Sequence, residues 1–85
     1  MFSVYVMRSF KDGKQYTGWT SDLQRRLREH NAGKTESTKR RRPLVLVHSE
    51  SFDAKDEAEK RERFLKSGRG REELKIMIDG AVPKW

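Results

Sequence analysis

The 85-residue chain is long enough for one domain with a modest core, and none of its apolar stretches approaches the roughly 20 residues that cross a bilayer. It contains no cysteine and only two histidines, which excludes disulfides, thiolate metal sites and a zinc site built from histidine alone. Any metal would therefore be held by carboxylates and water, as Mg²⁺ and Mn²⁺ are. The net charge is +7, and residues 1–50 contain 11 Lys/Arg against 5 Asp/Glu, which favours a basic patch for a polyanion over a uniformly solvated basic surface.

Two strands joined by a tight turn are expected first. Residues 2–7 are rich in β-branched and aromatic side chains, and residues 15–19 read as the returning strand. The Asp12-Gly13 dipeptide between them is typical of a hairpin turn. Gly18, inside the second strand, indicates a bulge or a place where another backbone approaches closely.

A helix and a third strand should follow the hairpin. Ser21 and Gln24 have the spacing of a capping box, and Gly33 is placed to close a helix that runs to about Asn31. Residues 34–43 are polar and basic and end in proline, which predicts a loop. Residues 44–48 are a short apolar run of branched side chains, which predicts a buried strand that could extend to residue 52.

Two further helices are expected in the remainder of the chain. Residues 53–67 predict a charged helix that Gly68 and Gly70 should end, and residues 71–79 predict a short last helix. The order of elements is then ββαβαα, an α+β fold in which a small three-stranded sheet is covered by helices. We expect a single domain over residues 1–85 and, because the amino terminus reads as a strand and not as a leader, a cytoplasmic location.

The first predicted helix carries three arginines, of which one is placed to act at a site. At about 100° per residue, the inward face of the helix is formed by Leu23, Leu27 and His30. Arg26 lies on the shoulder of that face, where its guanidinium could grip a phosphate in a bidentate manner. The alternative is a solvated or stem-buried arginine, and His30 could equally bond a backbone carbonyl at the helix end.

The second charged helix offers a carboxylate. Its inward stripe contains Ala54, Ala58 and Leu65, and Glu62 flanks that stripe. One carboxylate with waters and a substrate phosphate commonly holds Mg²⁺ in phosphoryl-transfer sites. The alternative is a glutamate paired with a neighbouring Arg61 or Lys66, or with Arg26 across the gap.

Tyr5 and Tyr16 lie on the two strands of the predicted hairpin and could project from one face of the sheet. A tyrosine beside a cation can orient or activate water. Tyrosines in strands are also common as packing residues, so neither one identifies a site by itself.

Taken together, these residues resemble the GIY-YIG nuclease family, which includes homing and restriction endonucleases and the incision subunit of nucleotide excision repair. The segments that match the family motifs are Val4-Tyr5-Val6, Tyr16-Thr17-Gly18, the helix with Arg26 and His30, and Glu62-Arg63-Phe64-Leu65-Lys66. The likeness covers roughly residues 2–76 and is strongest to small stand-alone bacterial members. Two departures are evident: Val4 replaces the first glycine of the motif, and Leu74 stands where larger members have an asparagine that helps to order the site.

The resemblance implies a metal-dependent endonuclease acting on DNA. Glu62 would hold one Mg²⁺ or Mn²⁺ ion, and Arg26 would stabilise charge on the phosphoryl oxygens. Tyr5 or Tyr16 would deprotonate or orient the attacking water, with His30 assisting, and Gly18 would serve a structural role in the motif. Flanking phosphates would be bound by exposed basic residues, namely Arg25, Arg28, Lys39, Arg40, Arg41 and Arg42.

Two other functions are compatible with the sequence. The chain could be a nucleic-acid-binding module with a degenerate nuclease site, in which the cationic surface is kept without turnover. It could also be an interaction protein whose basic loop meets an acidic partner. We expect low sequence specificity, since no DNA-targeting domain is evident, and nothing in the sequence reads a base or separates DNA from RNA.

Overall fold

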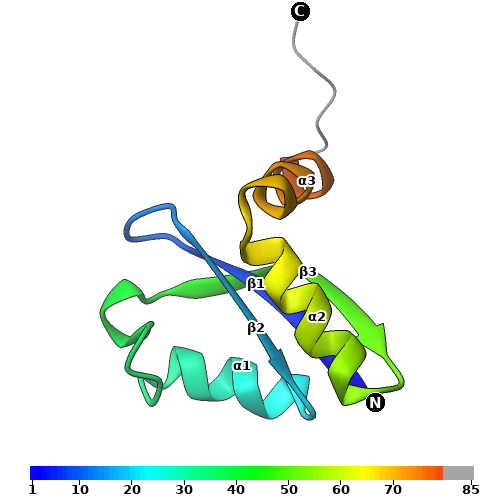
Figure 1. Ribbon diagram of the computed structural model, residues 1–85. Helices are drawn as coiled ribbons and strands as arrows, with labels where there is room; N and C mark the ends of the chain where they lie inside the picture. Colours follow the sequence, from blue (N-terminus) through cyan, green and yellow to red (C-terminus); the bar gives the residue numbers. More distant parts are fainter. Residues whose placement is uncertain (80–85) are drawn as a thin grey trace, which may run out of the picture.

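The computed structural model describes residues 1–79 of the chain and contains one three-stranded antiparallel sheet with helices on both faces (Figure 1). The central strand is β1 (Phe2–Ser9), flanked by β2 (Gln15–Thr20) and β3 (Leu44–Phe52). The helices are α1 (Leu23–Asn31), α2 (Lys55–Lys66) and α3 (Gly68–Asp79), and the loop before β3 contains a short 3₁₀ helix, η1 (Lys39–Arg41). The predicted ββαβαα order and α+β class are confirmed.

The alternation of side chains along β1 divides the core between the two faces of the sheet. Val4 and Val6 point to one face, where they pack with buried residues of α2 and α3, namely Ala58, Leu65 and Leu74. Tyr5 and Met7 point to the other face, where they pack with Leu44, Leu23 and Leu27. Helix α1 therefore covers one face, and α2 and α3 cover the other (Figure 1).

Gly18 makes room for a side chain and not for a bulge. The pairing of β1 with β2 is regular across this position, with Tyr5 directly opposite Gly18, and the register shift of the sheet lies instead between β1 and β3 at Val6/Met7. A Cβ atom on Gly18 would lie 2.7 Å from the hydroxyl oxygen of Tyr5 and 2.9 Å from its Cζ. The tyrosine ring lies over the glycine, so the absence of a side chain there is what lets Tyr5 stay in the sheet face.

The start of α1 differs from the prediction. The N-cap is Asp22, whose carboxylate accepts a hydrogen bond from the backbone amide of Arg25 at 3.1 Å, so the expected Ser21–Gln24 capping box is wrong. An aspartate is as good a cap as a serine, and its negative charge also interacts favourably with the positive end of the helix dipole. The predicted end is confirmed, because Gly33 has φ of +78° and follows the last turn.

The expectation that Gly68 and Gly70 end a helix is also wrong in detail. Helix α2 ends before Ser67, and both glycines belong to α3. Gly70 is buried, and a Cβ there would collide with the carbonyl oxygen of Phe64 and lie 2.6 Å from the Cα of Leu65. Gly70 therefore allows the first turn of α3 to pack directly against the last turn of α2.

No helix within residues 1–79 is long and apolar enough to span a membrane.

Candidate active site on the face of the sheet covered by α1

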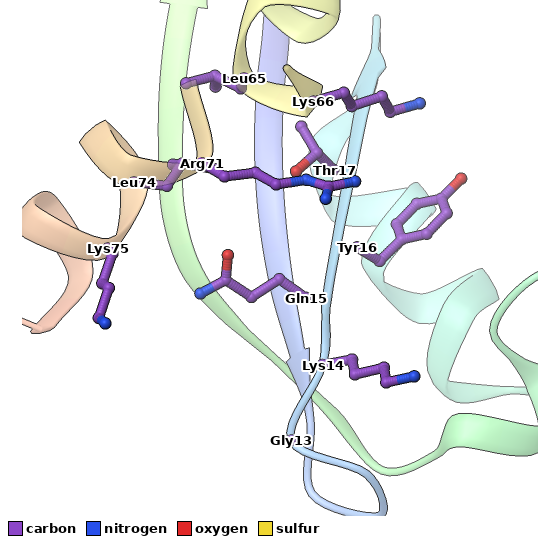
Figure 2. A pocket seen from close by; sticks show the side chains of 10 residues that line it. All are labelled: Gly13, Lys14, Gln15, Tyr16, Thr17, Leu65, Lys66, Arg71, Leu74 and Lys75. Atoms are coloured by element: carbon purple, nitrogen blue, oxygen red, sulfur yellow. The ribbon is translucent and has the colours of Figure 1, made fainter. Parts of the chain in front are cut away.

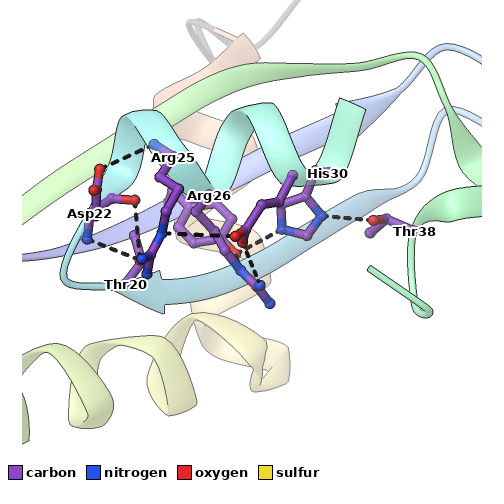
Figure 3. A network of polar contacts seen from close by, with 8 residues as sticks. Thr20, Asp22, Arg25, Arg26, His30 and Thr38 are labelled. Carbon is purple, nitrogen blue, oxygen red and sulfur yellow. Dashed lines mark hydrogen bonds and ion pairs between the residues drawn. The ribbon is translucent and has the colours of Figure 1, made fainter. Parts of the chain in front are cut away.

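The candidate site is centred on Tyr5, whose side chain is 1% exposed and lies between β1 and α1. Its hydroxyl is 2.9 Å from Nε2 of His30 and accepts a longer hydrogen bond, of 3.4 Å, from Nε of Arg26. Arg26 and His30 are four residues apart on α1 and thus project from the same side of the helix (Figure 3). Two elements distant in sequence are joined here by polar contacts in a buried setting.

His30 is completely buried and is held by side chains on both ring nitrogens. Nε2 faces Tyr5, and Nδ1 lies 2.7 Å from Oγ1 of Thr38, which is also fully buried (Figure 3). If Arg26 donates to the tyrosine oxygen, the arrangement that satisfies every group has Tyr5 donating to Nε2 and Nδ1–H donating to Thr38. Burial, and then the nearby charge of Arg26, lower the pKa of His30, which favours this neutral form.

The protonation of Tyr5 is set by opposing influences. Burial raises the pKa of its hydroxyl, and the hydrogen bond from Arg26 lowers it, with a net result above the ordinary value. A phenol of this kind stays protonated at neutral pH and serves as a hydrogen-bonding link more readily than as a base.

Arg26 keeps part of its hydrogen-bonding capacity for a ligand. Its side chain is 35% exposed, Nε donates to Tyr5, and Nη1 donates to Glu29 at 3.1 Å. Within residues 1–79, Nη2 has no partner. The guanidinium is thus oriented by two contacts while one edge remains available, which is how an arginine is prepared to bind an oxyanion.

Tyr16 completes an aromatic cluster on the same face. Its ring centroid lies 6.3 Å from that of Tyr5 and 5.0 Å from that of His30. The prediction that both tyrosines project from one sheet face is confirmed. Unlike Tyr5, Tyr16 is only partly buried and lines a surface pocket, so its hydroxyl is the more accessible of the two.

Glu62 is on α2 and does not join this hydrogen-bonded cluster. Its side chain is 18% exposed and forms an ion pair of 2.8 Å with Lys66, one turn further along the helix. Lys66 lines the same pocket as Tyr16, on the outer side of the edge strand β2 (Figure 2). Glu62 thus lies one helical turn before Lys66, which lines the pocket beside Tyr16. No hydrogen bond or ion pair within residues 1–79 links Glu62 to Tyr16.

The carboxylate of Glu62 could serve as the single protein ligand of a metal ion. No group of three or more His, Cys, Asp or Glu side chains within residues 1–79 could hold an ion by itself. A single half-buried carboxylate fits Mg²⁺ or Mn²⁺ when water and substrate phosphate supply the other ligands. That Glu62 already bears a cationic partner, Lys66, indicates a site favourable to positive charge.

The six basic residues predicted to bind nucleic acid differ in what they contact. Three are held by the protein: Lys39 pairs with Glu36, Arg42 donates to the carbonyl of Lys39, and Arg41 pairs with Asp12 at 3.1 Å. Arg25 and Arg28 line one small hollow on the outer side of α1, where Arg25 is 3.8 Å from Glu29. Arg40 is exposed and has no ion pair within the described residues.

Two residues of the site were not found from the sequence. Thr38 lies in a polar segment predicted as loop, and only its position beside Nδ1 of His30 makes it part of the network. Glu29 holds Arg26, and the signal that could have indicated it is the three-residue spacing of opposite charges on one helix.

The chain is similar to known proteins over most of its length. Residues 1–75 match the family described as the GIY-YIG catalytic domain. A UPF0213 protein of Halobacterium salinarum is 51% identical over 67 residues, covering 78% of this chain and 86% of the relative. A UPF0213 protein of Staphylococcus saprophyticus is 41% identical over 78 residues, covering 91% of this chain and 94% of the relative. The solution NMR structure of the UPF0213 protein BH0048 from Bacillus halodurans is similar with a TM-score of 0.57 at 38% identity, covering 91% of this chain and 85% of that one.

Proposed function

The chain belongs to the GIY-YIG family, a nuclease superfamily, and on that premise we propose that it is a divalent-metal-dependent endonuclease that hydrolyses DNA phosphodiester bonds. The observation that carries the proposal is the hydrogen-bonded cluster of Tyr5, Arg26 and His30, which orients an arginine while leaving one edge of its guanidinium available. A satisfied buried polar network fixes the positions of its members, and here it fixes an arginine that still has hydrogen-bonding capacity for a phosphate.

In this proposal the work is divided among the side chains by their exposure. Arg26 binds a non-bridging oxygen of the scissile phosphate and stabilises the charge that develops there. Tyr16, the more accessible tyrosine, orients the attacking water, whereas Tyr5 holds Arg26 and His30 in place. His30, neutral and anchored by Thr38, fixes the direction of the Tyr5 hydroxyl.

Glu62 is the residue that would hold the Mg²⁺ or Mn²⁺ ion. When bound, such an ion supplies charge stabilisation to the phosphoryl oxygens. Lys66 would then give up its ion pair with Glu62 and turn to a substrate phosphate. Sequence specificity should be low, because the lysine and arginine side chains on this surface contact phosphates, which are the same in every DNA sequence.

The experiment that tests the proposal compares Glu62→Gln with Glu59→Gln. Both substitutions remove one carboxylate from α2, but Glu59 has no partner within residues 1–79 and no assigned role. Supercoiled and branched DNA are incubated with Mg²⁺ or Mn²⁺, and strand cleavage is followed on gels. The proposal requires cleavage by wild type and by Glu59→Gln but not by Glu62→Gln; cleavage by all three would point to a contaminating nuclease and contradict it.

One observation favours a second function, that of a nucleic-acid-binding module. Leu74 occupies the place of the late asparagine of larger family members and is 1% exposed within the apolar core. That position is therefore committed to packing and cannot order a site. Under this function wild type binds DNA and releases it uncut, and Glu62→Gln binds as well or better, because a negative charge has been removed from the surface.

A further inference from the structure

The structure contains a basic pocket that charge counting along the sequence did not reveal. It has a volume of about 800 Å³ and lies between the β1–β2 hairpin and the junction of α2 and α3 (Figure 2). No carboxylate lines it. Its wall includes four cationic side chains, namely Lys14, Lys66, Arg71 and Lys75. Three of these belong to residues 51–85, where 9 Lys/Arg are nearly balanced by 8 Asp/Glu, so the fold and not the composition gathers the charge.

Three of these four cations are not used to hold the fold together. Within residues 1–79, Lys14, Arg71 and Lys75 form no ion pair, and all three side chains are exposed. Arg71 and Lys66 reach across β2 from the helix junction, and Arg71 ends beside Thr17 (Figure 2). Several unpaired like charges around one hollow repel one another, so their convergence is unfavourable unless an anion occupies the space.

The pocket borders the candidate active site at Tyr16. Tyr16 belongs to its wall, and Lys66 joins it to Glu62 through the ion pair of 2.8 Å. We infer that this pocket binds one strand of the nucleic acid, over one or two nucleotides next to the scissile phosphate, with the backbone phosphates held by Lys14, Arg71 and Lys75. The inference rests on the proposed function, because it is the position of Tyr16 that makes the pocket adjacent to the scissile bond.

A single strand fits better than a duplex or an acidic peptide. The volume is that of a small-ligand pocket, suited to a nucleotide or two but much smaller than a double helix requires. Beside the cations, the partly exposed Tyr16 ring offers a surface on which a base can stack, a contact that sequence-independent single-strand binders use and that a glutamate side chain cannot make.

The test measures binding of a short labelled oligothymidylate by fluorescence anisotropy at several salt concentrations, without divalent metal so that no cutting occurs. Arg71→Gln/Lys75→Gln removes two cations from the pocket, and the control Lys60→Gln/Arg69→Gln removes two exposed cations of α2 and α3 outside it. Each contact with a single-strand phosphate adds about 0.7 to the slope of log K against log salt. This corresponds to a roughly fourfold change in affinity at physiological salt. The pocket variant should therefore bind roughly tenfold more weakly, with a slope smaller by about 1.4, whereas the control should bind like wild type.

Amide chemical shifts in the wild type locate the binding independently of the variants. The inference requires that the oligonucleotide shift the signals of Lys14–Thr17 and Leu74–Lys75. Equal losses in both double variants, shifts confined to Tyr5, Arg26 and His30, or equal binding of polyglutamate would each overturn the pocket assignment while leaving the nuclease proposal standing. Loss of binding in the pocket variant together with no cleavage by wild type in Mn²⁺ would keep the pocket and reject the nuclease.

Discussion

The hydroxyl oxygen of Tyr5 lies 2.9 Å from Nε2 of His30, so a tyrosine of the central strand and a histidine of α1 are joined inside the protein. Through Tyr5 the contact continues to Arg26, and through His30 to Thr38. The chain of four side chains connects the partly exposed guanidinium of Arg26 to the buried loop residue Thr38. Arg26 therefore depends for its orientation on the buried side chain of Tyr5, and this dependence leads to several measurable effects.

Gly18→Ala should destabilise the protein and misplace Tyr5. The new Cβ would lie 2.7 Å from the Tyr5 hydroxyl oxygen, and overpacking of this kind costs about 1–3 kcal/mol. Urea unfolding measures the loss of stability, and the His30 ring signals report the loss of its tyrosine partner. Gly68→Ala is the matched control, since a Cβ added there would meet no other group within 4 Å, and its effect should be neutral or slightly stabilising. Equal stability of Gly18→Ala and wild type would show that the ring can move aside without cost.

The free energy of unfolding should fall as the pH drops below about 6.5 because of His30. Burial lowers the pKa of His30 from its ordinary 6.5, so the unfolded chain takes up a proton that the folded protein refuses. The stability is complete above pH 6.5 and is lost toward lower pH, by at most about 1.4 kcal/mol per pH unit.

Urea unfolding between pH 5 and 7 measures this loss in wild type and in His30→Gln. Asp12 and Glu50 have pKa values below their ordinary 3.8 and 4.5, so their contributions are lost only under more acidic conditions. The variant should be less stable at pH 7 but less dependent on pH. Parallel curves for the two proteins would refute the assignment of a neutral buried histidine.

Tyr5→Phe and Tyr16→Phe should affect different properties. Removing the Tyr5 hydroxyl leaves Nε2 of His30 buried without a partner, which costs about 1–3 kcal/mol of stability. Tyr16 is only partly buried, so loss of its hydroxyl should cost little stability but slow cleavage by roughly 10²-fold or more if it orients water. Unfolding and single-turnover cleavage are measured on both variants. A Tyr16→Phe enzyme with wild-type rates would transfer the water-orienting role to another group.

Lys66→Gln should strengthen metal binding in the absence of DNA. The ammonium group of Lys66 occupies one oxygen of Glu62 at 2.8 Å, and a divalent ion must displace it. Paramagnetic broadening of α2 amide signals by Mn²⁺ should then begin at a several-fold lower concentration in the variant than in wild type. Lys60→Gln, on the same helix but without an ion pair, should behave as wild type. Unchanged broadening in Lys66→Gln would mean that Glu62 is not the ligand.

Much of the fold could be predicted because local and tertiary preferences agree. The β-branched and aromatic residues of β1, the Asp12-Gly13 turn and the amphipathic stripe of α2 each specify an element that packing then retains. The failures lie where the sequence offers equivalent choices. Ser21 and Asp22 are both competent caps, and Gly70 breaks a helix in isolation but is required here for close contact between α2 and α3.

The site was predictable only in part, for a similar reason. Helical spacing places Arg26 and His30 on one side of α1, and strand alternation places Tyr5 on the face that α1 covers. Periodicity cannot indicate which loop residue meets His30, so Thr38 was missed. The cations of the basic pocket were missed too, because Lys14 and Arg71 are far apart in the sequence and come together only in the folded chain.

The most direct test of the central claim is the rate at which supercoiled DNA is nicked in Mn²⁺ by Arg26→Ala, compared with wild type and Arg63→Ala. Arg63 is an exposed arginine of α2 with no ion pair within residues 1–79, and its removal changes the net charge by the same amount. If Arg26, oriented by Tyr5 and Glu29, stabilises the transition state, Arg26→Ala should lose at least about 10²-fold in rate while remaining folded, and Arg63→Ala should nick DNA at close to the wild-type rate. Equal nicking by all three proteins, or none by wild type, would contradict the assignment of an active nuclease site to this face of the sheet.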